Sequence, residues 1–185
     1  MSEGKPMGTH GRLVKEVLIA ANEIGAQVAV LPKDSSKALH EELLTRFSIR
    51  KSMTRIWEGM ANAAVVRDPN GWRLISEFLK EAPVIMLFDI VDDSGALRFE
   101  RGSDVTQVLA ASVGFEFYLT NDSIEYILAF NHHDFLIGDG SARQWIIGLV
   151  AHKGDRRDTS ERGNETPEAA GSGVVVGEGS VERGD

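Results

Sequence analysis

The stretch FEFYLTNDSIEYILAF (115–130) decides the predicted fold. Apolar and polar residues alternate along 115–120 and again along 124–130, and Asn121-Asp122-Ser123 separates the two runs. Alternation with a period of two is typical of a strand with one buried face, and a short turn between two such runs predicts an antiparallel hairpin. Because other segments of the chain have helical periodicity, the hairpin favours an α+β protein.

Helices and one central strand are predicted around this hairpin. The run VIMLFDIV (84–91) is nearly continuous in apolar and β-branched residues, so we expect a strand that is covered on both faces. Short strands are expected at 27–31 and 97–99, while 48–67 fits a helix in its first part and a strand over 63–66. Caps and helical spacing predict helices from Thr9 to Gly25, from Asp34 or Ser35 through Phe47, from Asp68-Pro69 to Pro83, from Ser103 or Asp104 to Gly114, and from Ser141 onward. The predicted fold class is therefore α+β, with a mixed, mainly antiparallel sheet covered by helices in a single domain.

A change in composition near Lys153 divides the chain. Residues 1–152 form the predicted globular α+β domain, because 42% hydrophobic and 26% charged residues overall are ordinary values for a globular protein. Residues 153–185 contain no aromatic residue, seven glycines and 13 charged residues among 33. Such a Gly/Glu-rich segment buries too little apolar surface to offset the entropy of ordering it, so we expect a disordered tail.

Composition also excludes several classes of function. The chain has no cysteine, and therefore no disulfide, no thiolate metal site and no cysteine nucleophile. The formal net charge is −8, and residues 1–152 hold 20 acidic against 15 basic residues, so nucleic acid is not expected as a partner. We expect the N-terminal segment to be neither a signal peptide nor a membrane span, because Glu16 and Glu23 interrupt its apolar positions. We therefore expect no membrane contact and a cytoplasmic location.

The segment Asn131-His132-His133-Asp134 follows the hairpin and precedes Asp139. His132, His133, Asp134 and Asp139 could serve as the acid–base groups or metal ligands of a hydrolase, because imidazole and carboxylate groups suit both tasks. Adjacent histidines on a strand point to opposite faces, whereas a turn would relax this, and no HExxH or HxH spacing supplies a third metal ligand. We therefore favour a turn whose Asn and Asp satisfy backbone groups, with no catalytic residue and no bound metal.

The basic residues Arg46, Arg50, Lys51 and Arg55 form the one local basic run of the predicted domain. They could hold a phosphate or an acidic peptide, but several glutamates lie close to them in the sequence. We expect these residues to form the solvated, charge-paired face of a helix.

The segment FEFYLTNDSIEYILAFNHHDFLIGDGSARQWI (115–146) resembles small uncharacterised bacterial proteins of the kind found among immunity proteins to interbacterial toxins. The resemblance rests on the aromatic hairpin, the NHHD step at 131–134, Gly140 and Trp145, and it covers at most half of the chain. It implies a protein that binds and occludes a toxin, with no cofactor and no turnover.

Four residues of the hairpin form the predicted binding surface. Glu116, Asp122 and Glu125 supply negative charge. Tyr118 can pack its ring and still present a hydroxyl to a partner, although a half-buried position in the sheet is the alternative. Attraction between an acidic surface and a basic partner raises the association rate. We therefore expect a non-enzymatic protein-binding domain, for example an immunity-type inhibitor of a basic toxin domain.

Overall fold

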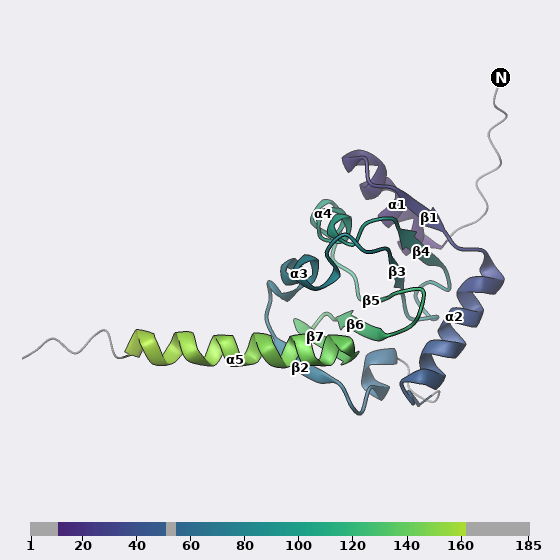
Figure 1. The fold of residues 1–185 in the computed structure, drawn as a ribbon. Coiled ribbons are helices and arrows are strands. Elements are labelled where there is room, and N and C mark those ends of the chain that lie inside the picture. The colour runs from purple at the N-terminus through teal and green to yellow at the C-terminus, as the bar shows by residue number, and fades with distance from the viewer. Residues whose placement is uncertain (1–10, 51–54, 162–185) are drawn as a thin grey trace, which may run out of the picture.

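A single antiparallel sheet of seven strands, in the order β1-β4-β3-β5-β6-β7-β2, organises the described part of the chain. The computed structural model describes residues 11–50 and 55–161. The strands are β1 (Val28–Val30), β2 (Ala64–Arg67), β3 (Val84–Leu87), β4 (Ala96–Phe99), β5 (Phe117–Thr120), β6 (Tyr126–Phe130) and β7 (Phe135–Gly140). The helices are α1 (Arg12–Ile24), α2 (Lys33–Arg46), α3 (Ile75–Leu79), α4 (Ser103–Ala111) and α5 (Ser141–Glu161), with short 3-10 helices η1 (Ile56–Gly59) and η2 (Gly71–Leu74). The predicted α+β fold, a mainly antiparallel sheet covered by helices in one domain, is confirmed (Figure 1).

The predicted hairpin forms from β5 and β6, in which Phe117 pairs with Phe130. A third strand, β7, pairs with β6 and extends the hairpin into a meander. The sequence analysis predicts no strand at the position of β7, because it assigns residues 138–140 to the connection that leads into the last helix. Gly138 explains how β7 and α5 fit together, because a Cβ at this position would lie 2.8 Å from the Cδ1 of Ile146. The NHHD segment is consequently the β6–β7 turn.

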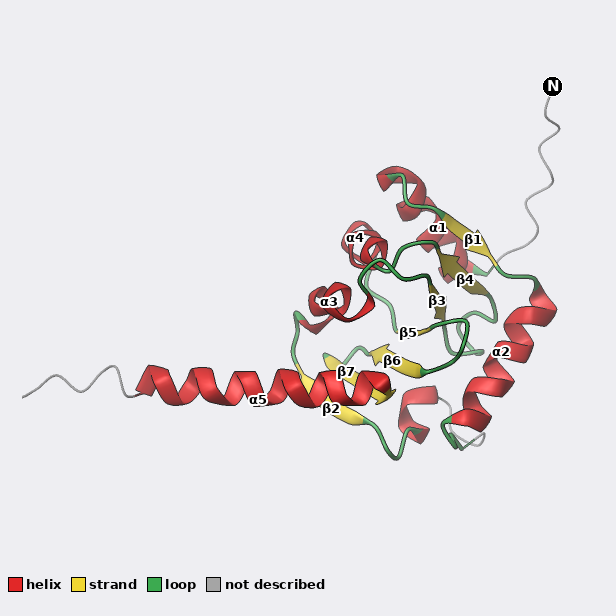
Figure 2. Cartoon of the chain, in the orientation of Figure 1, coloured by secondary structure: helices red, strands yellow, loops and turns green. Residues whose placement is uncertain are grey.

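Helices cover both faces of the sheet and enclose two separate hydrophobic cores (Figures 1 and 2). Helices α1, α3, α4 and α5 cover one face, where their apolar residues pack with alternate side chains of the strands. Helix α2 and η1 cover the other face. The first core includes Val17, Ile75, Met86, Phe99, Val108, Leu128 and Ile146, and the second includes Leu43, Ile49, Leu87, Tyr118, Ile127 and Ile137.

Strand β3 is buried along its whole length, which confirms a strand covered on both faces. It ends at Leu87, however, and does not continue to Val91 as the apolar run predicts. Asp89 is buried after the strand ends, whereas Ile90 and Val91 are exposed. We call residues 88–95 the β3–β4 loop.

The end of α1 agrees with its prediction, whereas the starts of two other predicted helices do not. Helix α1 ends before Gly25, whose φ of 74° is the left-handed conformation that glycine adopts readily. Helix α2 begins directly after Pro32 without a side-chain cap, so the prediction of Asp34 or Ser35 as its cap is wrong and both residues lie inside the helix. The helix predicted from Asp68 to Pro83 is reduced to η2 and α3, because the Asp68 carboxylate accepts the N–H of Asn70 in a turn.

Helix α5 begins at the predicted Ser141 and runs to Glu161, past the domain boundary expected near Lys153. Its later turns extend away from the sheet (Figure 1). The predicted cap Thr9 and the rest of the predicted tail, 162–185, lie outside the described residues. No helix within 11–50 or 55–161 combines the length and the apolar character needed to cross a membrane.

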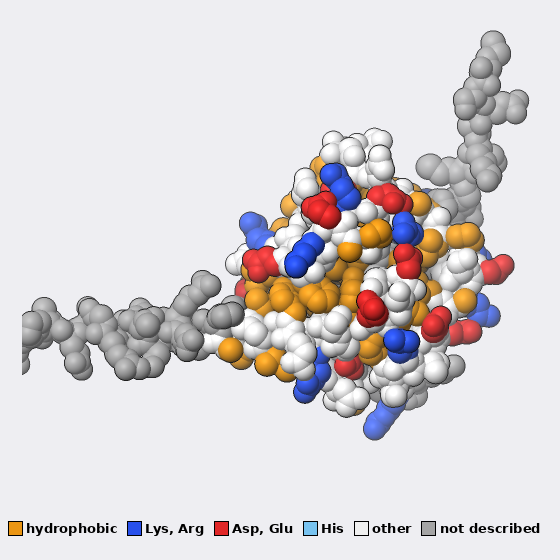
Figure 3. Space-filling model, viewed as in Figure 1, with side chains coloured by type: hydrophobic (Ala, Val, Ile, Leu, Met, Phe, Trp, Pro, Cys, Tyr) orange, Lys and Arg blue, Asp and Glu red, His pale blue; other side chains and the backbone are white. Residues whose placement is uncertain are grey.

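The face shown in Figure 3 carries acidic and basic side chains interspersed with one another, and hydrophobic side chains lie between them. Mixed charge of this kind keeps a surface hydrated without building a strong field of one sign. A local excess of charge therefore has to be sought in the arrangement of particular side chains.

Candidate functional site

The carboxylate of Asp89 is buried where β3 gives way to the β3–β4 loop. The backbone N–H of Ile56 donates to its Oδ1 over 2.8 Å, and the hydroxyl of Tyr118 donates to its Oδ2 over 2.9 Å. Nη1 of Arg55 donates to the same Oδ2 over 3.2 Å. One carboxylate thus joins the start of η1 and the strand β5 to the end of β3.

Burial and these hydrogen bonds act on the pKa of Asp89 in opposite directions. Removal from water raises the pKa from its ordinary value of 3.8, while the N–H of Ile56, the hydroxyl of Tyr118 and the guanidinium of Arg55 oppose the rise. Burial, followed by the nearby charge of Asp89, raises the pKa of the Tyr118 phenol. The phenol therefore keeps its proton and remains the donor of this pair.

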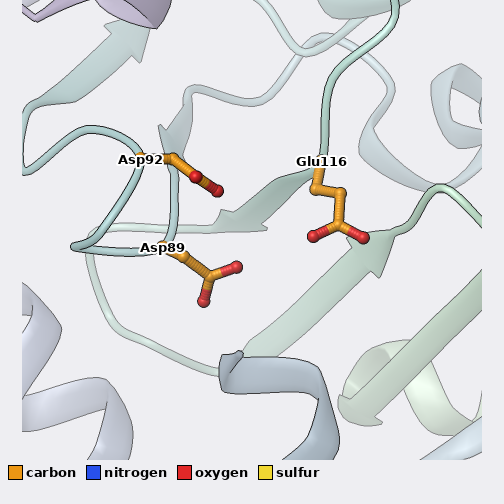
Figure 4. A group of neighbouring side chains, drawn as sticks. All are labelled: Asp89, Asp92 and Glu116. Atoms are coloured by element: carbon orange, nitrogen blue, oxygen red, sulfur yellow. The ribbon is translucent and has the colours of Figure 1, made fainter. Parts of the chain in front are cut away.

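Asp92 and Glu116 bring two further carboxylates to Arg55. Figure 4 shows that Asp89 and Asp92, from the β3–β4 loop, and Glu116, from the segment before β5, face a common space. Nη1 of Arg55 forms an ion pair with Asp92 and lies 3.4 Å from Oε2 of Glu116. The hydrogen bond with Asp92 is the main cause that raises the pKa of Arg55, so its guanidinium stays charged. Arg55 is the cation that these three carboxylates share.

His132 and His133 lie in the β6–β7 turn beside this cluster. Oε1 of Glu116 accepts the backbone N–H of His132 over 3.1 Å and also contacts its Nδ1. The centroids of the two imidazole rings are 3.8 Å apart, and the ring of His133 meets that of Trp57 edge-on. Both imidazoles lie together because a turn lacks the alternation that separates adjacent side chains on a strand.

A solvent-open cleft of about 490 Å³ connects these side chains, and we call it the acidic cleft. Together with the buried Asp89, it combines four carboxylates with two guanidinium groups. Negative charge therefore exceeds positive charge when the carboxylates are ionised and the imidazoles are neutral. The lining residues are Arg12, Leu13, Arg55, Asp92, Gly114, Phe115, Glu116, Phe130, Asn131, His132 and Asp134.

Two buried polar atoms of the acidic cleft have no hydrogen-bond partner among the described residues. One is Nδ2 of Asn131, a residue that is 2% exposed. Its Oδ1 accepts the backbone N–H groups of His133 and Phe135 over 3.1 Å each, which identifies Nδ2 as the unused donor. The other is Oε2 of Glu116, which accepts no hydrogen bond although Arg55 lies 3.4 Å away. A buried polar atom without a partner costs free energy, which applies to Nδ2 of Asn131, whereas Oε2 of Glu116 keeps its ion pair with Arg55.

The carboxylates of Asp89, Asp92 and Glu116 could also hold a metal ion, because one oxygen of each lies within 4.8 Å of the others. Oxygen ligands of this kind suit a hard divalent cation such as magnesium or calcium. Nη1 of Arg55, however, lies among the same oxygens and supplies positive charge there. A metal ion would therefore have to displace this guanidinium.

The structure separates the four residues of the predicted binding surface. Glu116 lies in the acidic cleft. Tyr118 is fully buried in the second core, so its prediction as a surface anchor is wrong and the alternative of a position inside the sheet applies. Asp122 and Glu125 lie at the opposite end of the hairpin, where Asp122 pairs with Arg98 over 3.0 Å.

The predicted catalytic set is also divided. His132 and Asp134 line the acidic cleft, and the ring of His133 lies against that of His132. Asp139 pairs in register with Ile127 near the other end of β6, and its carboxylate accepts the N–H of Gly140. The sheet register therefore keeps Asp139 away from the two histidines.

Sequence reasoning missed Arg55, Asp89 and Asp92 as members of the site. A carboxylate inside the apolar run 84–91 is the signal that could have found Asp89, because a buried charge requires partners. The sequence predicts Arg55 on a solvated helix face, but the structure places its side chain, which is 28% exposed, in an ion-paired cluster. No local pattern identifies the partners of Arg55, since they come from distant parts of the chain.

Comparisons of the chain with models of protein families, with curated proteins and with solved structures find no match.

Proposed function

We propose that the chain is a non-enzymatic protein-binding domain of the immunity type, which engages a basic partner, such as a toxin domain, at the acidic cleft. The supporting observation is the charge of this cleft, where three carboxylates and two guanidinium groups line one solvent-open space and the buried carboxylate of Asp89 lies beside them. A positive side chain that enters gains attraction, and the protein walls reduce screening by solvent. Such binding requires neither a cofactor nor a metal ion.

Exposed apolar residues that directly precede Asp92 in the chain supply contact area for the same partner. Ile90 and Val91, in the β3–β4 loop between Asp89 and Asp92, are 60% and 68% exposed. Apolar side chains next to charged ones are the usual composition of a protein interface. The proposed binding surface therefore consists of the acidic cleft and the outer side of the β3–β4 loop. We propose that the protein works in the cytoplasm. A chain without cysteine forms no disulfide and therefore does not depend on an oxidising compartment.

The partner to test first is the protein encoded beside this chain's own gene, because toxins and their inhibitors have to be produced together. We expect co-expression of the chain to protect cells that produce this neighbouring protein. With the two purified proteins, Asp92→Asn should slow association several-fold at low salt, and added salt should slow the wild-type chain more than the variant. Glu77→Gln, which removes an exposed carboxylate of α3 outside the cleft, is the matched control and should leave the rate unchanged. Absence of binding would contradict the proposal, and so would an association rate that changes neither with salt concentration nor with Asp92→Asn.

The contact between His132 and Glu116 favours a second candidate function, acid–base hydrolysis in the same cleft. A carboxylate that holds an imidazole can orient it as a general base. Turnover of p-nitrophenyl acetate or bis(p-nitrophenyl) phosphate, with or without zinc or manganese, would support this function if His132→Ala abolished it. Equal rates for the wild-type chain, the variant and buffer would exclude hydrolysis of these substrates.

A further inference from the structure

Strand β2 ends the strand order of the sheet, so one of its edges pairs with β7 and the other is open. The N–H of Asp68 donates to a carbonyl of the β6–β7 turn, and alternation along the strand therefore directs the polar groups of Val66 and Ala64 to β7 as well. The backbone N–H and C=O groups of Val65 and Arg67 point to the open edge. Such groups can pair with a strand of another chain.

One side of α5 carries exposed apolar residues next to this open edge. Arg143, Ile147 and Val150 follow one another at helical spacing, and the two apolar residues are 42% and 47% exposed. Nε of Arg143 donates over 3.0 Å to the carbonyl oxygen of Asn62, in the turn that leads into β2. Trp145 points to the opposite side of the helix, where it stacks on a ring of α3. Ile147 and Val150 therefore lie on the side of α5 that faces outward at β2 (Figure 1).

A second copy of the chain fits the open edge through a twofold axis that passes through Val65, perpendicular to the sheet. This axis pairs β2 with its copy in the antiparallel sense, and Val65 exchanges both of its backbone hydrogen bonds with Val65 of the copy. Ala64 and Val66 pack on the core that α5 covers, so the side chain of Val65 lies on the other face, where it is 50% exposed. In the pair, the two Val65 side chains cover each other.

The same axis brings the two α5 helices together, because it keeps both of them on one face of the joined sheet. A Cβ at Gly138, the register partner of Ala64, would contact Ala142 and Ile146 of α5. The next residue, Ile147, therefore lies level with the middle of β2. Ile147 of one copy faces Ile147 of the other across the seam.

Charge complementarity supports this register. The axis places Asp68 of one copy level with Asn62 of the other, which is where the guanidinium of Arg143 lies. By strand alternation, Asp68 lies on the face that α5 covers, so it can pair with Arg143 of the second copy, and symmetry forms this pair twice. The register also keeps the two Arg67 side chains apart, since each lies opposite Ala63.

We propose that the chain forms a twofold homodimer in which the two β2 strands join the sheets of both copies and the outer sides of the two α5 helices meet across the seam. The dimer closes an open edge that would otherwise be free to pair with other chains. This inference is independent of the function proposed for the acidic cleft.

Sedimentation of the full-length chain between about 1 µM and about 300 µM tests self-association, and we expect a monomer–dimer equilibrium. Amide hydrogen exchange of the ¹⁵N-labelled chain over the same concentrations locates the interface. Exchange of the Val65 and Arg67 N–H groups should slow as the concentration rises, because the second copy accepts them. Exchange of the Val66 N–H, which points to β7, should not depend on concentration.

Lysine substitutions at the seam place like charges opposite each other. Val65→Lys and Ile147→Lys should each raise the dissociation constant of the dimer at least about tenfold. Val113→Lys, after α4, and Ile19→Lys, on α1, are the matched controls, since they change exposed residues of the same types away from the seam and should leave the constant unchanged. Thermal unfolding shows which variants fold. If Val65→Lys does not fold, Ile147→Lys and the exchange measurement still decide the result.

Two charge reversals test the register itself. Arg143→Glu and Asp68→Lys should each weaken the dimer several-fold, because each puts like charges together at both symmetric contacts. An equimolar mixture of the two variants should dimerise more tightly than either variant alone. A mixed dimer contains one native pair and one reversed pair, and both are attractive.

A chain that stays monomeric over the whole concentration range would overturn the inference. So would a dimer in which the Val65 and Arg67 N–H groups still exchange rapidly, or a mixture of the charge variants that dimerises no better than each alone. Protection of these two N–H groups by a different protein, without self-association, would assign the open edge to another chain and would likewise make the inference wrong.

Discussion

The carboxyl group of Asp89 is buried next to the acidic cleft, and hydrogen bonds to this group offset the free-energy cost of its burial. The group is 2% exposed, yet it accepts from Ile56, Tyr118 and Arg55. A buried carboxylate is tolerated only when such donors replace the lost water. The residues that shape the cleft thus also support the end of β3.

Tyr118→Phe should lower the free energy of unfolding by about 1–3 kcal/mol, because it removes a donor from a buried carboxylate and fills the same space. Urea unfolding followed by tryptophan fluorescence measures the loss. Tyr126→Phe is the control, since Tyr126 belongs to the core on the other face of the sheet and its loss should be smaller. Equal losses for the two variants would show that the Tyr118 hydroxyl does not support Asp89.

The raised pKa of Asp89 predicts a particular dependence of stability on pH. The native state holds this proton more tightly than the unfolded chain, so the contribution of Asp89 to stability is fully present below the ordinary pKa of 3.8 and is lost as pH rises through the raised value. Asp89→Asn carries no titrating group at this position. The stability of the variant relative to the wild-type chain should therefore rise as pH increases from the ordinary pKa of 3.8 through the raised value, as measured by urea unfolding at several pH values. A difference that is constant, or that falls over this window, would contradict the prediction.

Among the elements, the β3–β4 loop directs its apolar side chains to solvent and its carboxylates toward the sheet and the acidic cleft. Asp89 turns inward to the sheet, while Ile90 and Val91 turn outward and Asp92 lines the acidic cleft. The meander of β5, β6 and β7 supplies the opposite wall, because Glu116 precedes β5 and the NHHD turn joins β6 to β7. The cleft therefore depends on the register of these strands as well as on its own residues.

Two glycines near the start of α5 should respond to alanine with opposite signs. Gly140 has a φ of 63°, and a Cβ there would lie 2.2 Å from the carbonyl oxygen of Glu125, so Gly140→Ala should cost at least about 2 kcal/mol. Gly148 lies within α5 with nothing within 4 Å of a Cβ, so Gly148→Ala should add up to about 1 kcal/mol through helix propensity. Thermal unfolding of the two variants checks both signs. A stabilising Gly140→Ala would show that β7 does not end as described.

On the scale of the whole molecule, the two cores lie on opposite faces of one sheet and use residues between Leu13 and Leu149. Leu13, Phe115 and Phe130, which belong to or pack against the first core, line the acidic cleft, while Tyr118 of the second core donates to Asp89. Stability of the domain and shape of the cleft therefore both follow from the central strands.

Deletion of residues 162–185 should leave the unfolding temperature within about 2 °C of the full-length value, because both cores are already built from residues that the structure describes before this segment. Differential scanning calorimetry measures the midpoint. Sharp, poorly dispersed amide signals that disappear with the deletion would agree with the disordered tail predicted from composition. A midpoint several degrees lower would instead mean that the segment packs on the domain.

The sequence by itself determined the features that depend on neighbouring residues: the hairpin of β5 and β6, the buried strand β3, the end of α1 at Gly25 and the start of α5 at Ser141. Periodicity and turn chemistry are local, so a single sequence displays them. Only the tertiary structure decided the acidic cleft, because Arg55, Asp89, Asp92, Glu116 and His132 come together through strand order and register, and no pattern along the chain records which distant residues will meet. For the same reason the structure buried Tyr118 and separated Asp139 from the histidines, since a side chain's surroundings depend on what packs against its strand and not on its neighbours in the sequence.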